Sequence, residues 1–157
     1  MTAVKTPAAP PRGPDAGLRR EFRARLVGWQ WTSVESPLAA PGCPDSEYCA
    51  PGGASGWVEY KRTAAFAVTL RPLQVAWLQR RARLGGRCFV AVRRITAKGA
   101  DELWLYPGGR VTELADSGLR TPGPLGVWPG GPAHWSWAEV GGVMTSAPTV
   151  GGSTWGG

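Results

Sequence analysis

The 157-residue sequence lacks several features that would place it in common functional classes. It has no run of about 18 apolar residues, so we expect no membrane-spanning helix. It contains one histidine, His134, and no nucleophile matched to it, which argues against a Ser/His or Cys/His hydrolase. No glycine-rich loop is followed by Lys-Ser or Lys-Thr, which argues against a nucleotide triphosphatase.

Cysteine is also scarce, since the sequence contains only Cys43, Cys49 and Cys88. The number is odd, and residues 1–17 contain no apolar secretory segment. We therefore expect reduced thiols and a cytoplasmic location. The spacing between Cys43 and Cys49 differs from the C-x2–4-C spacing of zinc sites, which argues against structural zinc.

Glycine and proline are abundant, with 23 and 15 residues, and they concentrate toward the two ends of the chain. This distribution predicts one ordered domain that is shorter than the chain. We expect a disordered arm over 1–17 and a domain over 18–120. A Trp/Gly/Pro-rich extension over 121–145 is expected to pack on that domain, and residues 146–157 are expected to form a disordered tail.

Hydrophobic periodicity and turn residues predict alternating helices and strands. Helices are expected over 18–27, 72–84 and 111–119, with a further turn within 138–145. Strands are expected over 29–34, 45–48, 56–63, 64–70, 88–92 and 103–106. The wholly apolar run 88–92 is typical of a central strand that is buried on both faces. The order predicts a three-layer α/β domain with a mixed sheet.

The stretch 56–63 carries the most informative pattern in the chain. Successive side chains of a strand point to opposite faces, so Glu59 and Lys61 should lie side by side. Asp45 falls on the preceding strand of the expected hairpin, where its carboxylate can meet that of Glu59. Glu59 and Lys61 fit either an exposed ion pair or a metal ligand beside a cation that positions a nucleophile.

The sequence Pro44-Asp45, followed by Glu59-Tyr60-Lys61 and by Gln74 early in a helix, resembles the PD-(D/E)xK nuclease superfamily. Within it, the similarity is greatest to nucleases of the VRR-NUC kind, which resemble Holliday-junction resolvases and have phage-encoded relatives. The resemblance covers roughly residues 18–107. It implies an αβββαβ core of the restriction-endonuclease type, with a mixed central sheet and the site at one end of the sheet.

The resemblance also implies roles for particular residues. Asp45 and Glu59 would bind Mg²⁺ or Mn²⁺ together with the backbone carbonyl of Tyr60, and Lys61 would be the catalytic lysine. This agrees with the chemistry of the side chains, because hard divalent cations take carboxylate oxygens and two adjacent carboxylates repel each other without a cation.

Two further positions match the pattern of the same family. Glu35 matches an acidic residue that assists the metal site, and Gln74 matches a glutamine that reaches the site from the start of a helix. The implied activity is metal-dependent hydrolysis of phosphodiester bonds in DNA, with endonuclease action favoured over exonuclease action. Structure-selective, resolvase-like cleavage and a homodimer are the corresponding family-level expectations.

The net charge of +7, from 18 basic and 11 acidic residues, favours a polyanionic partner. Seven arginines around the second long helix and the following strand are candidates for contacts with the DNA backbone: Arg71, Arg80, Arg81, Arg83, Arg87, Arg93 and Arg94. Two alternatives remain open at this stage. One is a non-catalytic nucleic-acid-binding module that retains the nuclease fold, and the other is an interaction protein that works through its Trp-rich C-terminal segment.

Overall fold

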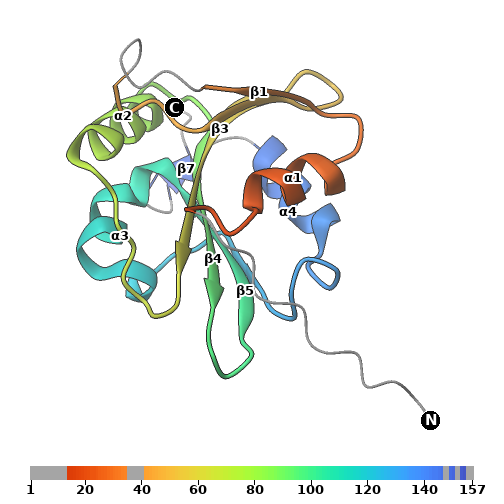
Figure 1. Cartoon of the computed structure of the whole chain (residues 1–157). Helices are drawn as coiled ribbons and strands as arrows, with labels where there is room; N and C mark the ends of the chain where they lie inside the picture. Colours follow the sequence, from red (N-terminus) through yellow and green to blue (C-terminus); the bar gives the residue numbers. More distant parts are fainter. Residues whose placement is uncertain (1–13, 35–40, 147–148, 151–152, 155–157) are drawn as a thin grey trace.

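The computed structural model describes residues 14–34, 41–146, 149–150 and 153–154 (Figure 1). Most of the expected arm over 1–17, Glu35 and most of the expected tail over 146–157 therefore lie outside the described residues. The helices are α1 (Leu18–Arg25), α2 (Pro72–Arg83), α3 (Val111–Ser117) and α4 (Trp137–Thr145), with the 3-10 turns η1 (Gly108–Arg110) and η2 (Gly118–Arg120). None of the described helices is long and apolar enough to cross a membrane.

Six strands form one sheet, and a short pair forms a second. The large sheet contains β1 (Gln30–Ser33), β2 (Ser46–Cys49), β3 (Ser55–Thr63), β4 (Cys88–Ile95), β5 (Asp101–Pro107) and β6 (Gly126–Trp128), in that spatial order. Strands β3 and β4 are parallel, and their neighbours pair antiparallel. The short pair is β7 (Thr149–Val150) and β8 (Ser153–Thr154). The predicted mixed α/β sheet is confirmed, and the observed elements begin in the order α, β, β, β, α, β.

The sheet separates two hydrophobic cores, because side chains alternate between its faces. In β4, Phe89 and Ala91 pack with Leu18 and Phe22 of α1, whereas Val90 packs on the opposite side. Helices α1 and α4 cover one face of the sheet, and α2 and α3 cover the other (Figure 1). Residues 88–93 of β4 are all buried, which confirms the predicted central strand.

The predicted strand over 64–70 is wrong, since this segment is an irregular connection between β3 and α2. Val68 is buried, but Phe66 is 39% exposed. Both edges of β3 are already paired, with β2 and β4, so no edge beside it is available to another strand. The backbone oxygen of Phe66 instead accepts a 2.7 Å hydrogen bond from the N–H of Leu119, which fastens the connection to η2.

The segment 121–145 contributes to the main sheet and to the core beneath α1 and α4. Strand β6 pairs with β5, and α4 lies on the same face of the sheet as α1. Trp128 and Trp135 are buried in this core, and Trp137 packs edge-on against Phe22 with ring centres 5.2 Å apart. The tryptophans therefore belong to the fold of the domain.

Candidate active site

Strand β3 places Glu59 and Lys61 together on the face covered by α2. Val58 and Tyr60 alternate with them and point into the core beneath α1. The Nζ atom of Lys61 lies 3.4 Å from Oε1 of Glu59. Glu59 is 2% exposed and Lys61 is partly buried, so the interpretation as an exposed ion pair is wrong.

Gln74, in the first turn of α2, joins both members of this pair. Its Nε2 donates to Oε1 of Glu59 at 2.7 Å, and its Oε1 accepts from Nζ of Lys61 at 3.1 Å. The same Oε1 accepts from the backbone N–H of Arg71 at 3.0 Å. These partners determine the orientation of the amide, because the reverse orientation would point its NH2 group at two donors.

Asp45 immediately precedes β2, whose first residue, Ser46, is paired with Val58. Oδ2 of Asp45 accepts a 3.1 Å hydrogen bond from the backbone N–H of Tyr60. This bond holds the Asp45 carboxylate across the hairpin beside Glu59. The sequence-predicted residues Asp45, Glu59, Lys61 and Gln74 are therefore brought together.

The electrostatics of Glu59 show that this carboxyl group is held in an unfavourable place for a negative charge. Burial, the largest cause, and the nearby charge of Asp45 together raise its pKa to about 7, against a lowering by Lys61. Its Oε2 atom is buried and has no hydrogen-bond partner among the described residues. A bound cation beside Oε2 would relieve both the repulsion and the unpaired oxygen.

The backbone of Tyr60 offers a third oxygen on the same side. Its N–H points toward Asp45, and in an extended strand the carbonyl of the same residue points the same way. The paired residues of β2 and β3 end at Ser46 and Val58, so this carbonyl lies beyond the last pair. Within the described part of the chain, no three Asp, Glu, His or Cys side chains converge on one point, so a metal here would rely on two carboxylates and a carbonyl.

Arg19 is a site residue that sequence reasoning missed. Its Nη2 lies 3.8 Å from Oδ1 of Asp45, and about a third of each side chain is exposed. The Nε atom of Arg19 is buried, and no described residue accepts a hydrogen bond from it. The helical periodicity identifies Arg19 only as one of several arginines around the apolar stripe of α1, and no local signal in the sequence connects it to Asp45.

The turn before Asp45 packs against the start of α2. Gly42 has a φ of +78°, and a Cβ atom there would lie 2.1 Å from the backbone oxygen of Leu73. The next residue, Cys43, lies near the site charges: burial raises the pKa of its thiol, Arg81 lowers it, and Glu59 raises it. The turn therefore fixes Asp45 relative to Gln74. All three cysteines are free thiols.

The predicted DNA-contacting arginines fall into different environments. Arg71, Arg80 and Arg83 are exposed around α2. Arg81 is half-buried, with its guanidinium carbon 4.5 Å from the ring centre of Trp77 and 5.7 Å from that of Trp57. These four arginines lie on the same side of the sheet as Glu59 and Lys61.

The remaining three arginines are committed to contacts within the domain. Arg93 is 5% exposed and donates to both carboxylate oxygens of Asp101, at 2.8 and 2.7 Å. Arg94 donates to Glu102 at 2.9 Å, and Nε of Arg87 donates to the Ser146 carbonyl at 2.8 Å. Arg93 is on the α1 face of the sheet, away from Glu59, and is not accessible to a phosphate.

Glu35, the remaining predicted site residue, lies outside the described residues. Comparisons of the chain with protein-family models, curated proteins and solved structures find no match. The functional interpretation therefore depends on the geometry of the site.

Proposed function

We propose that the protein is a metal-dependent nuclease of the PD-(D/E)xK type, with a restriction-endonuclease-like core, that hydrolyses phosphodiester bonds in DNA. One observation carries this proposal: the buried Glu59 is ion-paired to Lys61 and hydrogen-bonded to Gln74, Gln74 also accepts from Lys61, and the Asp45 carboxylate lies beside the group. A surface ion pair would not need to be buried, bridged by an amide and placed beside a second carboxylate.

The residues that would hold Mg²⁺ or Mn²⁺ are Asp45, Glu59 and the backbone carbonyl of Tyr60. Their oxygens are the hard ligands that these cations prefer, and the buried, unpaired Oε2 of Glu59 supports this assignment. When bound, such a cation lowers the pKa of a coordinated water and neutralises charge on the phosphate.

The chain itself supplies orientation and positive charge. Lys61 is held at one end of β3 by Glu59 and Gln74, so that its ammonium group can orient a water molecule and donate to a phosphate oxygen. Gln74 keeps Glu59 and Lys61 at fixed positions, which reduces the reorganisation needed during the reaction. Arg19 provides a further cation for a phosphate oxygen once Asp45 engages a metal.

DNA is the proposed partner, and the backbone would be recognised without base readout. The exposed Arg71, Arg80 and Arg83, with Arg81 held against two indole rings, lie on the α2 side of the site. Together with the net charge of +7, they suit phosphate contacts and counterion release.

The test is cleavage of labelled four-way junction, flap, duplex and single-stranded DNAs in Mg²⁺, in Mn²⁺ and in EDTA. We expect cleavage that requires the metal and is lost in Glu59→Gln. The control is Glu113→Gln in α3, at an exposed glutamate that pairs with Arg110 at 2.9 Å. Metal-independent DNA binding without cleavage by any of the three proteins would instead support the non-catalytic binding module.

A further inference from the structure

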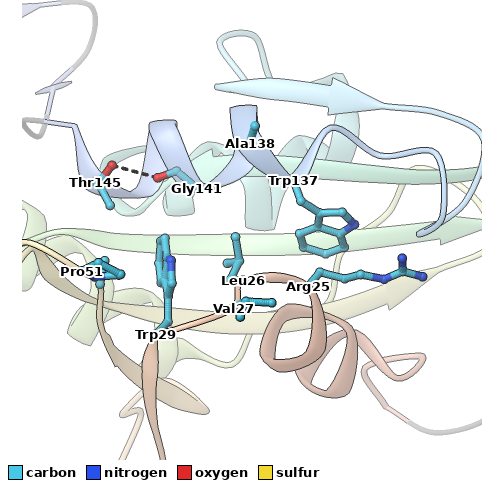
Figure 2. A pocket seen from close by; sticks show the side chains of 10 residues that line it. Arg25, Leu26, Val27, Trp29, Pro51, Trp137, Ala138, Gly141 and Thr145 are labelled. Carbon is cyan, nitrogen blue, oxygen red and sulfur yellow. Dashed lines mark hydrogen bonds between the residues drawn. The ribbon is translucent and has the colours of Figure 1, made fainter.

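A shallow slot of about 410 Å³, open to solvent, lies between the α1–β1 turn and α4. Figure 2 shows Trp137 at the start of α4 above Arg25, and Trp29 rising from the turn toward Gly141. Leu26 lies between these two tryptophans in the same view. The slot is thus lined by aromatic and apolar groups, with an exposed arginine at its mouth.

The walls of the slot are held in place by the surrounding structure. The indole N–H of Trp137 donates to the Pro132 carbonyl at 2.8 Å. Trp29 stacks on Trp31, with ring centres 5.9 Å apart and an interplanar angle of 13°. Gly141 lets α4 pack closely on this turn, since a Cβ atom there would lie only 3.3 Å from both Leu26 and Trp29. A flat ligand would therefore enter a largely preformed site.

Three arginines of α1 lie along the path from the candidate active site to this slot. Arg19 reaches Asp45, and Arg23, one helical turn further along α1, donates to Ser33 of β1. Arg25 follows at the mouth of the slot and is bonded to Glu21 at 3.3 Å. The six residue steps from Arg19 to Arg25 correspond to about 9 Å of helix, a distance that a short stretch of nucleic-acid strand can span.

We propose that the slot binds an unpaired base of the DNA strand whose phosphate lies at Asp45, Glu59 and Lys61. The inference rests on the proposed function for the identity of that strand. A paired base would have to unstack and unpair before entering the slot, at a cost in free energy, whereas an unpaired base can stack on an indole without that cost while the arginines of α1 contact its backbone. The substrate class is then DNA with unpaired nucleotides, such as a single strand, a flap or an open junction.

The test fills the slot without removing its walls. Ala138 is exposed and lines the slot, so Ala138→Met adds a side chain there. Gly142→Met adds the same side chain to the same helix at a position where a Cβ atom meets nothing within 4 Å. Binding of fluorescein-labelled single-stranded and duplex DNA is measured by anisotropy in EDTA, where no metal-dependent cleavage occurs.

We expect Ala138→Met to weaken single-strand binding about tenfold, the effect of losing one base–aromatic stack, and to leave duplex binding unchanged. Gly142→Met should bind both DNAs as the wild type does. A second variant, Arg25→Gln, changes an exposed side chain and should reduce the salt dependence of single-strand binding by about one counterion.

Unchanged single-strand binding in both Ala138→Met and Arg25→Gln would overturn the slot proposal, as would an equal loss for duplex and single strand in Ala138→Met. These outcomes are independent of catalysis. If the wild type cleaves DNA but the slot variants bind normally, the nuclease proposal stands and the slot proposal fails. If nothing is cleaved but Ala138→Met selectively loses single-strand binding, the slot proposal stands and the nuclease proposal fails.

Discussion

Gln74 donates from Nε2 to Oε1 of Glu59 at 2.7 Å, across the interface between α2 and β3. Because Oε1 of the same amide accepts from Lys61, one side chain fixes both a carboxylate and an ammonium group. Pro72 begins α2 two residues before Gln74, so the position of this amide is set by where the helix begins.

Replacing Gln74 should impair the site without unfolding the domain. We expect Gln74→Met to lower cleavage by about 10- to 100-fold, the usual cost of losing a residue that orients a metal ligand. The measurement is single-turnover cleavage together with the metal concentration that gives half-maximal rate. Gln79→Met, on the same helix but bonded to Thr112 of α3, is the control. Equal rates in the two variants would show that Gln74 does not position the site.

Glu59 makes the stability of the domain depend on pH. Its pKa is raised from 4.5 to about 7, so the folded state holds this proton more tightly than the unfolded state does. The contribution of this proton to the free energy of unfolding is fully present below about pH 4.5, and it is lost as the pH rises through about 7. At pH 8 we expect Glu59→Gln to have a free energy of unfolding about 1–3 kcal/mol above that of the wild type, measured by urea titration.

Mg²⁺ should offset this loss in the wild type, because the proposed metal site uses the deprotonated carboxylate of Glu59. The rise in melting temperature on adding Mg²⁺ should be larger at pH 8 than at pH 6, and it should be absent in Glu59→Gln. Glu113→Gln should respond as the wild type does. A Mg²⁺-induced rise of the same size in Glu59→Gln would place the metal elsewhere.

The arginines should separate into structural and DNA-contacting groups. Removing Arg93 leaves Asp101 without its bidentate partner, so Arg93→Ala should cost about 3–5 kcal/mol of unfolding free energy in a urea titration. Arg80 is exposed, so Arg80→Ala should change stability by less than about 0.5 kcal/mol while reducing the salt dependence of DNA binding. A small stability loss in Arg93→Ala would contradict the assignment of Arg93 to the core.

Local patterns in the sequence were enough to predict the elements that carry the site. Each of three local patterns predicts the secondary structure of its own segment. They are the alternation around Glu59, the proline that begins α2 and the apolar run of β4. The order of Asp45, Glu59 and Gln74 along these elements then predicts that they converge. Burial of the Glu59–Lys61 pair was left open because it depends on how α2 covers the strand.

Long-range packing determined the features that were not predicted. The alternation of Phe66, Val68 and Leu70 indicates a strand, but no sequence signal shows that both edges of β3 are already taken. The contact of Arg19 with Asp45 depends on how α1 sits on the sheet. Neighbouring Arg93 and Arg94 differ because they point to opposite faces of β4, one into the core and one toward Glu102.

The most direct test of the central claim compares two lysines in single-turnover cleavage of labelled DNA with Mg²⁺. Lys61 is held in the site by Glu59 and Gln74, whereas Lys98 is exposed in the turn between β4 and β5. We expect Lys61→Ala to lose about 100-fold or more in rate while remaining folded, as judged by a cooperative melting transition, and Lys98→Ala to cleave normally. Metal-dependent cleavage that proceeds equally well in Lys61→Ala would contradict the account.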